Sequence, residues 1–376
     1  MQTLYINLIS ETILIVFETS LAIQLFYWLI IYRKVFSFRN SKTEIQNIPV
    51  SVIICAKNEE ENLRNHLPLI MEQNYQNFEV IVVNDCSFDG SELLLNQFKD
   101  KYSNLYVTTI RADKKFTHGK KLALSLGIKA AKNEILILTD ADCYPVSNNW
   151  IASIVNNYKP ETEVILAYGG YEQTSGFLNI IIRYETLFNS MQFLTLAKLG
   201  IPYMGVGRNL SYKKNLWVKN KGFAEFNHIL SGDDDLFVNK NANKKNTNIS
   251  FSDDSITRSK AKKTFISLVR QKRRHFEAGK FYKFKHKIIL GTEIFSRFLF
   301  YSSLIYLLIF QDLYIFLLPI FIIRLIIQTF ILNFAAKRFK EKKVSFFIII
   351  FDIIIPIMNL GIAFTNLFIR KRKTWN

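Results

Sequence analysis

The sequence reads ILILTDAD at residues 135–142, where a run of apolar residues leads directly into two carboxylates. The apolar run predicts a buried β-strand that ends at Asp140. Because side chains alternate along an extended chain, Asp140 and Asp142 are expected to project to the same side. Two neighbouring carboxylates repel each other unless a cation joins them, and hard divalent ions prefer oxygen ligands. The stretch therefore predicts a metal site at a strand end.

The residues around this stretch alternate between short β-branched runs and helical patterns. We expect strands at 50–55, 79–84, 105–110, 134–139 and 163–168, and helices at 59–73, 90–100 and 119–131. This alternation predicts an α/β fold with a mainly parallel, twisted sheet and helices on both faces. Ligands bind such sheets beyond the carboxyl ends of the strands. Asn58 and Asp89, each followed three residues later by a glutamate, are expected to cap the helices that follow them.

Two further segments place charged side chains beside strand ends or helix starts. Asp85 follows a strongly apolar run, and its carboxylate can accept hydrogen bonds from a nucleobase or a ribose. Lys120 and Lys121 open a predicted helix, where free N–H groups favour an anion. We expect one of these lysines to neutralise a phosphate; the alternative interpretation is a solvated basic turn.

Two downstream segments carry concentrated charge. Residues 231–236 read SGDDDL, which indicates either a solvated acidic turn or a general base. On the helix predicted around QKRRH, Gln271 and Arg274 share one face and are expected to point into the site. Lys272 and Arg273 are expected instead to form a basic patch beside the membrane.

The order and spacing of these segments resemble glycosyltransferase family 2, in particular its membrane-integrated branch of cellulose, hyaluronan and poly-N-acetylglucosamine synthases. The resemblance covers residues 48–280 and the flanking apolar segments. It implies a GT-A fold, Mg or Mn as the metal, and a nucleotide-sugar donor, most commonly a UDP-sugar. It also implies that the sugar is transferred with inversion to a lipid-linked or polysaccharide acceptor.

The resemblance assigns donor-side roles residue by residue. Asp85 lies where the family contacts the nucleobase, and Lys120 lies where a basic residue contacts the nucleotide. Asp140 matches the first carboxylate of the Asp-x-Asp motif, near the ribose and the metal. Asp142 matches the second carboxylate, which is the direct metal ligand.

The resemblance also assigns the acidic segment and a glycine-containing loop. Alignment on the terminal Asp-Leu makes Asp233 the catalytic base. The family usually has glutamate directly before that base, where this chain has Gly232, so Asp234 remains a rival. The loop GVGRNL at 205–210 resembles the acceptor-side loop of the family.

Gln271 and Arg274 match the Gln-x-x-Arg-Trp signature of processive synthases, which the resemblance places on the substrate side. The final Trp is His275 in this chain. An imidazole offers a smaller stacking surface than an indole. The sequence therefore leaves open whether one sugar or many are added.

Long apolar segments flank the charged region. Residues 12–32 predict a membrane anchor, and the Arg33-Lys34 pair after it places its C-terminal end in the cytosol. Further apolar blocks lie at 293–311, 313–335 and 344–369. We expect an anchor at 1–34, a cytosolic glycosyltransferase domain at 45–290 with a basic interfacial helix near 264–280, and a membrane region at 291–376. The predicted location is the inner or plasma membrane, with several passes.

The C-terminal membrane region is expected to hold two or three membrane segments. Its blocks contain Arg324 and Asp352, and intramembrane charges usually face protein. We expect these two residues to pair between adjacent helices. Four full spans would put the basic tail at 370–373 outside, against the positive-inside rule. The last block, which contains Pro356, is therefore interpreted as a re-entrant or interfacial segment.

The composition of the chain indicates which kinds of partner it binds. The chain has 49 Lys and Arg against 31 Asp and Glu, a net charge of +18. Because the basic clusters abut apolar segments, they favour membrane lipid over nucleic acid. Three irregularly spaced cysteines argue against a disulfide framework. The alternative to an enzyme is a non-catalytic, nucleotide-binding membrane subunit of a polysaccharide export or assembly complex.

Overall fold

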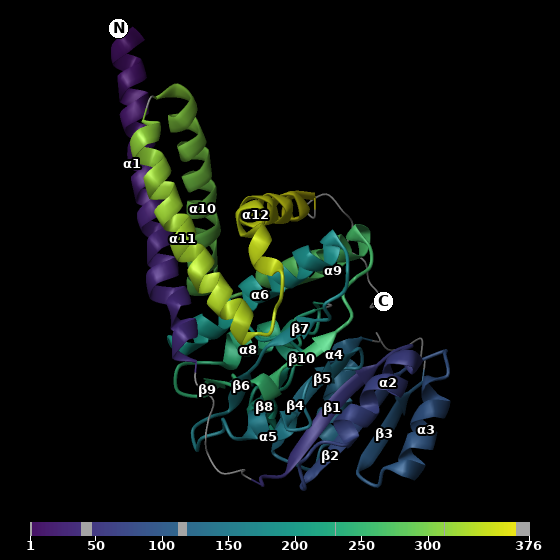
Figure 1. Ribbon diagram of the computed structural model, residues 1–376. Helices are drawn as coiled ribbons and strands as arrows, with labels where there is room; N and C mark the ends of the chain where they lie inside the picture. The colour runs from purple at the N-terminus through teal and green to yellow at the C-terminus, as the bar shows by residue number, and fades with distance from the viewer. Residues whose placement is uncertain (1, 39–46, 112–118, 230, 312, 366–376) are drawn as a thin grey trace.

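The computed structural model describes residues 2–38, 47–111, 119–229, 231–311 and 313–365. Within them, a bundle of long helices projects from an α/β part (Figure 1). The bundle combines a helix from the beginning of the chain with helices from its end. The segment between them forms the α/β part.

A seven-stranded mixed sheet forms the centre of the α/β part. In spatial order its strands are β3 (Leu105–Ile110), β2 (Phe78–Asp85), β1 (Val50–Ala56), β4 (Ile135–Asp140), β8 (Leu210–Lys213), β6 (Val164–Leu166) and β9 (Thr247–Ile249). The first four run parallel, whereas β8 runs antiparallel to both β4 and β6. All five predicted strands are present: four of them are the parallel strands β1 to β4, and the one expected at 163–168 is β6.

Helices cover both faces of this sheet. One face packs against α2 (Glu60–Met71), α3 (Ser91–Lys101) and α5 (Trp150–Val155), and the other against α4 (Lys120–Ala130), α6 (Phe177–Lys198), α7 (Lys214–Lys219) and α8 (Asp235–Asn241). Alternating residues of β1 enter the two cores: Ile54 packs on the α2 side and Ile53 on the α4 side. Burial on both faces explains why β1 reads as an uninterrupted apolar run.

A smaller sheet borders the carboxyl end of β4. Its strands, in spatial order, are β5 (Cys143–Pro145), β10 (Thr257–Ser259) and β7 (Gly169–Tyr171). Strand β10 runs antiparallel to β5 and parallel to β7. Because β5 begins three residues after β4 ends, the chain turns sharply through Asp142 between the two sheets.

The starts of α2 and α3 share a single carboxylate. Asp89 accepts a hydrogen bond from the Glu60 N–H at 3.0 Å and another from the Ser91 N–H at 3.1 Å. Asn58 has a positive φ of 56°, and its side chain accepts from the Phe88 N–H instead of from its own helix. The predicted cap at Asn58 is therefore wrong, and Asp89 serves two helices rather than one.

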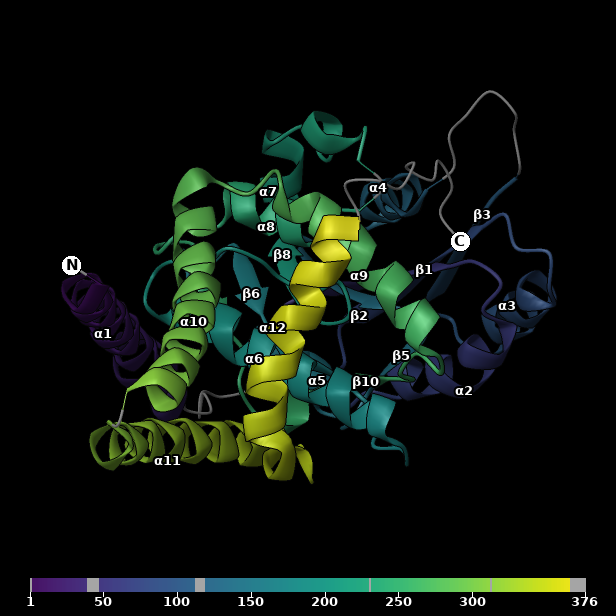
Figure 2. The same cartoon turned by 90° about the horizontal axis from the view of Figure 1, so that it is seen from above.

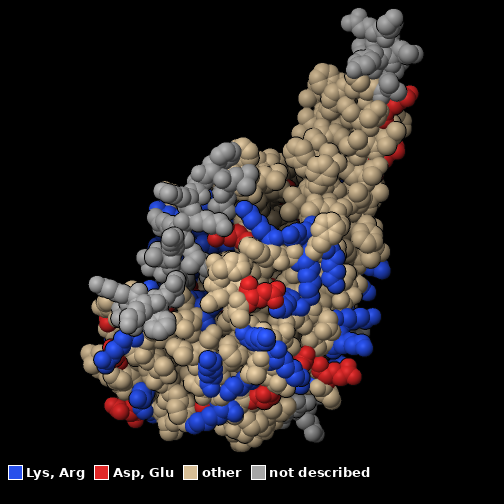
Figure 3. Space-filling view, turned by 180° about the vertical axis from the view of Figure 1, so that it is seen from behind, with Lys and Arg blue, Asp and Glu red and all other residues tan. Residues whose placement is uncertain are grey.

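Four of the described helices are long and apolar enough to cross a membrane. Their ranges are Ile9–Ser37, which begins in α1 (Gln2–Phe26), and the whole of α10 (Phe284–Phe310), α11 (Tyr314–Arg338) and α12 (Ile348–Thr365). Helices α1, α10 and α11 form the projecting bundle (Figure 1). Its visible surface carries few charges in Figure 3, whereas Lys and Arg are spread over the adjoining α/β part.

Helix α12 lies across the direction of the bundle instead of along it (Figures 1 and 2). Seen from above, it runs over α6 and α9 (Phe265–Gly279), and it contacts both helices. The interpretation of the last apolar block as a re-entrant or interfacial segment stays a prediction. The basic tail at 370–373 lies outside the described residues.

Buried ion pairs hold α12 to the bundle. Arg324 Nη2 on α11 lies 3.0 Å from Asp352 Oδ2 on α12. Arg297 on α10 contacts the other oxygen of Asp352 at 3.2 Å and also pairs with Glu293. The predicted pairing of Arg324 with Asp352 is confirmed, and it is part of a network of two cations and two anions. Such compensation is what buried charges require.

Candidate active site

A cleft opens where the carboxyl end of β4, the small sheet, the start of α8 and helix α9 meet. Its volume is about 340 Å³, which lies in the range of small-molecule sites. The segments predicted to carry chemistry contribute Lys120, Asp140, Asp142, Asp233, Asp234, Gln271 and Arg274 to its lining. These residues come from four segments spread over 155 positions of the sequence, and the fold brings them together.

Asp140 and Asp142 lie at the turn that follows β4. Asp140 is the last residue of the strand and pairs in register with Cys55 of β1. One ligand atom each from Asp140, Asp142 and Cys143 lie within 4.8 Å of one another. Burial and the charge of Asp140 raise the pKa of Asp142. A bound cation would relieve both effects, so the two carboxylates suit a hard divalent ion.

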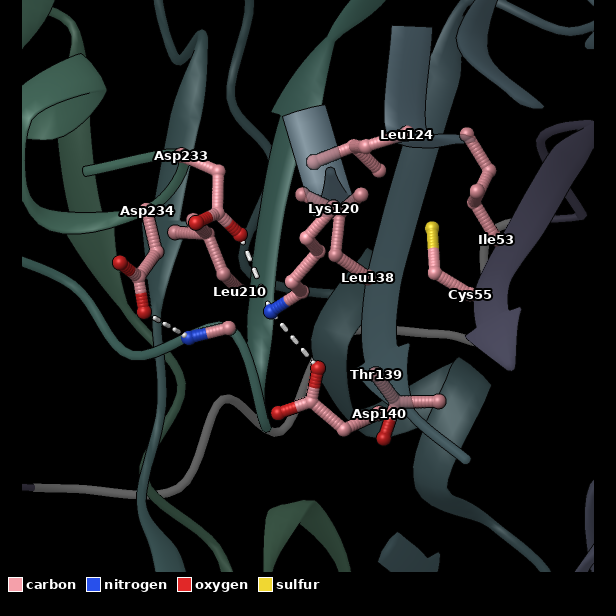
Figure 4. Close-up of a pocket in the computed structure, with 11 residues that line it drawn as sticks. Ile53, Cys55, Lys120, Leu124, Leu138, Thr139, Asp140, Leu210, Asp233 and Asp234 are labelled. Carbon is pink, nitrogen blue, oxygen red and sulfur yellow. Dashed lines mark hydrogen bonds and ion pairs between the residues drawn. The ribbon is translucent and has the colours of Figure 1, made fainter. Parts of the chain in front are cut away.

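Lys120 lies between the two acidic segments. Its Nζ atom is 2.8 Å from Asp140 Oδ1 and 3.0 Å from Asp233 Oδ2, as Figure 4 shows. Lys121 turns away from the cleft and donates to the carbonyl oxygens of Phe226 and Ile229. Burial lowers the pKa of Lys121 to about 8. Of the two lysines proposed to neutralise a phosphate, only Lys120 lines the cleft. Because Lys120 is ion-paired and Lys121 is buried, the alternative interpretation of a solvated basic turn is wrong.

The three adjacent carboxylates have different environments. Burial alone would raise the pKa of Asp233, but Lys120 outweighs burial and holds that pKa below its ordinary value. Burial and then the charge of Asp233 raise the pKa of Asp234 to about 6. Burial and then the charge of Asp234 raise the pKa of Asp235 to about 8. Among the three, Asp233 is therefore the group that is most readily ionised at neutral pH.

Asp234 has a structural task that competes with catalysis. Its Oδ2 accepts a hydrogen bond from the Gly207 N–H at 2.6 Å, and its Oδ1 accepts from the Asp235 N–H at 2.7 Å. The first bond anchors the loop at 205–210, and the second caps α8. Both oxygens are thus engaged by backbone donors, whereas Asp233 faces a flexible lysine side chain (Figure 4).

Gly232 has a conformational reason to replace the family's glutamate. Its φ is +98°, which side chains rarely adopt. A Cβ atom at this position would lie 2.4 Å from Leu236 Cδ1 in the first turn of α8. The backbone before Asp233 therefore takes a path that a glutamate would strain.

Helix α9 presents Gln271, Arg274 and His275 to the cleft. Gln271 Nε2 donates to the Tyr171 hydroxyl at 3.1 Å, and the Arg274 carbonyl accepts from Ser231. The shared face predicted for Gln271 and Arg274 is therefore present.

The expectation of an exposed basic patch at Lys272 is wrong. Its ammonium group is buried, pairs with Glu185 on α6 and donates to Asn359 on α12 at 2.8 Å. Arg273 donates to Thr365 at 3.2 Å. The two cations hold α12 to the helix that lines the cleft. The sequence did not show this, because α12 read only as an apolar segment.

Asp85 and Arg208 differ from what the sequence predicted for the site. Asp85 ends β2 and is buried, but it is not among the residues that line the described cleft. Its proposed contact with a nucleobase therefore stays a prediction. Arg208 does line the cleft and stacks over the Tyr171 ring at 4.3 Å from its centre. Its only sequence signal was its position in the loop at 205–210, and Tyr171 had none.

The sequence matches known proteins over the same region that builds the sheet. Residues 51–214 match the family model of glycosyl transferase family 2. This finding confirms the resemblance drawn from the motifs at Asp85, Lys120 and Asp140.

Several curated glycosyltransferases are similar to this region of the chain. Glycosyltransferase AglE of Haloferax volcanii is 30% identical over 192 residues, which cover 49% of this chain and 58% of the relative. A poly-beta-1,6-N-acetyl-D-glucosamine synthase of Staphylococcus epidermidis is 30% identical over 102 residues, or 27% of this chain and 24% of the relative. The chain spans about half of the length of the first curated relatives that it matches.

A solved structure reproduces the architecture. The mannosyltransferase PcManGT from Pyrobaculum calidifontis, in complex with GDP-Man and Mn²⁺, superposes with a TM-score of 0.55. The match covers 89% of this chain and 99% of the mannosyltransferase, at 17% sequence identity. The likeness shows a shared fold. Together with the family match, it confirms the predicted GT-A fold with apolar helices at both ends.

Proposed function

We propose that this chain is a membrane-bound, inverting glycosyltransferase. It would move a sugar from a nucleotide diphosphate donor, a UDP-sugar in our prediction, to a lipid-linked or polysaccharide acceptor. One observation carries the proposal: Lys120 joins the carboxylates of Asp140 and Asp233 in a single cleft of a glycosyltransferase family 2 domain. The cleft thus combines a cation site, a phosphate-binding cation and a base.

In this proposal, Asp140 and Asp142 hold a divalent ion, Mg or Mn. Their oxygen donors and the raised pKa of Asp142 fit such an ion. The solved relative PcManGT contains Mn²⁺. When bound, the ion would neutralise charge on the departing diphosphate. Lys120, already beside Asp140, would contribute a second positive charge.

Asp233 is our proposed base. It would take the proton of an acceptor hydroxyl as that oxygen bonds to the anomeric carbon of the sugar. The bond from this carbon to the diphosphate oxygen would break at the same time, and the diphosphate would leave with the bond electrons. A single displacement inverts the anomeric configuration. Asp234 is the rival, but its two oxygens are engaged by Gly207 and Asp235.

The remaining lining residues would bind substrate. Gln271 and Arg274 lie on α9, across the cleft from the Asp-x-Asp turn in our proposal, and would contact donor or acceptor oxygens. Arg208, whose guanidinium group lies over the Tyr171 ring, is a further cation suited to an anionic group. Asp85 is proposed to contact the nucleobase.

We further propose that the glycosyltransferase domain faces the cytoplasm of a cell whose inner or plasma membrane holds α1, α10 and α11. The Arg33-Lys34 pair at the end of the first apolar segment supports this orientation. Helix α12 would lie in the membrane interface beside the cleft, so a membrane-associated acceptor would reach the site without leaving the bilayer surface.

The test is a panel of nucleotide-sugar donors supplied to membranes that contain the full chain. Asp142→Asn is expected to weaken metal-dependent donor binding, because it removes a metal ligand. Asp233→Asn should leave donor binding intact and abolish transfer, because it removes the base. Full activity in both variants would refute the site. Donor binding without transfer by the unmodified chain would favour the non-catalytic subunit.

A further inference from the structure

Asp235 differs from its two acidic neighbours because a residue near a membrane helix holds it. Its Oδ2 accepts a hydrogen bond from the Tyr282 hydroxyl at 2.9 Å, and its Oδ1 accepts from the Leu236 N–H at 2.7 Å. Only 5% of Asp235 is exposed. Its carboxyl group is therefore fully occupied, and it lies two residues from Asp233.

Tyr282 occupies the junction between two functionally different helices. It follows α9, which lines the cleft, and precedes α10, the first long apolar helix after the glycosyltransferase domain. Its half-buried ring lies near Tyr203, with the ring centres 6.1 Å apart. The hydroxyl is thus fixed relative to α9 and α10 together.

The same junction holds the rest of α8. Asn239 Oδ1 accepts a hydrogen bond from the Lys283 N–H at 2.9 Å, and the Asn239 side chain contacts His286 Nδ1 at 2.9 Å. The Lys283 ammonium donates to the Lys240 carbonyl at 2.8 Å. Helix α8 has only seven residues, so contacts at both of its ends determine where its first turn lies.

We infer that Asp235 and Tyr282 are positioning residues that hold Asp233 in reach of Lys120 and the cleft. The inference rests on the proposed function, because it concerns the base of that reaction. Asp233 and Asp235 flank the α8 cap, so a shift of Asp235 away from Tyr282 would move the Asp233 carboxylate. A displacement of about 1 Å can lower the rate about a hundredfold.

The bond also ties the base to the membrane part of the molecule. Helix α10 pairs with α1 and α11 in the bundle, and its first turn contacts α8 through His286. A displacement of α10 would therefore reach Asp233 through Tyr282 and Asp235. This path consists of the hydrogen bond between Tyr282 and Asp235 and the short backbone segments on either side of it.

The test compares Tyr282→Phe, Asp235→Ala and Asp235→Asn in the full chain, each in the same membranes. Tyr282→Phe deletes only the donor hydroxyl, and Asp235→Ala deletes the acceptor. Both should lower kcat by about tenfold to a hundredfold, with the Kd for the donor within twofold of that of the unmodified chain. Asp235→Asn keeps one oxygen for Leu236 and an amide for the Tyr282 hydroxyl, so it should recover most of kcat.

The double variant and a matched control complete the design. Tyr282→Phe combined with Asp235→Ala should lose no more kcat than Asp235→Ala alone, because Asp235→Ala already removes the contact that Tyr282→Phe deletes. Tyr306→Phe, the same deletion farther along α10, should leave kcat unchanged; among the described residues, its hydroxyl has no hydrogen-bond partner.

The outcomes separate the inference from the proposed function. Unchanged kcat in Tyr282→Phe and Asp235→Ala, with transfer by the unmodified chain, would overturn the positioning role and leave the function standing. Parallel losses of kcat, donor binding and thermal stability would also overturn it, because they show a role in folding alone. Absence of transfer by the unmodified chain with every donor would overturn both.

Discussion

Arg324 Nη2 lies 3.0 Å from Asp352 Oδ2, and both side chains are completely buried. Asp352 also contacts Arg297, whereas Arg324 has further partners in Gln24 and Gln328. The two ends of the pair are therefore unequal. Loss of the Asp352 carboxylate leaves Arg324 without an anionic partner and Arg297 with Glu293 alone, while loss of Arg324 leaves Asp352 with Arg297.

The inequality predicts that Asp352→Asn destabilises the protein more than Arg324→Gln. Leaving a buried charge without its partner costs about 3–5 kcal/mol. Thermal unfolding of the detergent-solubilised full chain would measure the difference, with Glu18→Gln on the exposed face of α1 as the matched control. Equal midpoints for Asp352→Asn and the control would contradict the prediction. Exchange of the charges at 324 and 352 should rescue incompletely, because the new cation would face Arg297.

Lys120→Gln is expected to change how the reaction depends on pH. The ammonium group holds the pKa of Asp233 below its ordinary value, so its removal should raise that pKa. The acid limb of the kcat profile should then move to higher pH, and donor affinity should fall. Lys121→Gln is the matched control, because that side chain contacts Phe226 and Ile229 instead of the base. If the acid limb does not move in Lys120→Gln, the ionisation of Asp233 does not control kcat.

Gly232→Ala should damage the start of α8. Its φ of +98° and the 2.4 Å approach to Leu236 leave no room for a Cβ atom. We expect a loss of stability of about 1–3 kcal/mol and a larger loss of transfer, since Asp233 follows directly. Gly279→Ala is the control, because nothing lies within 4 Å of a Cβ there. Wild-type kcat and unfolding midpoint in Gly232→Ala would show that the backbone can relax.

The sheet was predictable from sequence because its strands are apolar on both faces. The apolar run before Asp140 predicted a buried strand, and an ionised carboxylate is costly inside such a core. The strand was therefore expected to end at Asp140, and ligands bind such sheets beyond the carboxyl ends of their strands. The acidic segment was also recognisable, because its residues are adjacent in the sequence.

The contacts between distant segments were not predictable. Lys272 read as a lipid-facing cation because its partners Glu185 and Asn359 lie 87 positions away in either direction. Asp89 read as the cap of one helix, although the start of α2 also comes within reach of it. The contacts of Lys272 and Asp89 depend on which distant segments the fold brings together, and a local sequence pattern does not contain that information.

Asp235 gives a prediction about stability and pH. Burial and the charge of Asp234 raise its pKa from 3.8 to about 8, so the folded chain holds a proton there that the unfolded chain has already released. A raised pKa of this kind stabilises the fold at low pH, and the contribution is lost as pH rises toward about 8. The unfolding midpoint of the unmodified chain should therefore fall, relative to that of Asp235→Asn, between about pH 4 and pH 8, and the difference should level off above pH 8. Asp235→Asn is neutral at every pH and keeps the bond to Tyr282, so it isolates the ionisation. Parallel midpoints for the two proteins across this range would mean that Asp235 is already ionised at low pH, and that Tyr282 holds a charged group.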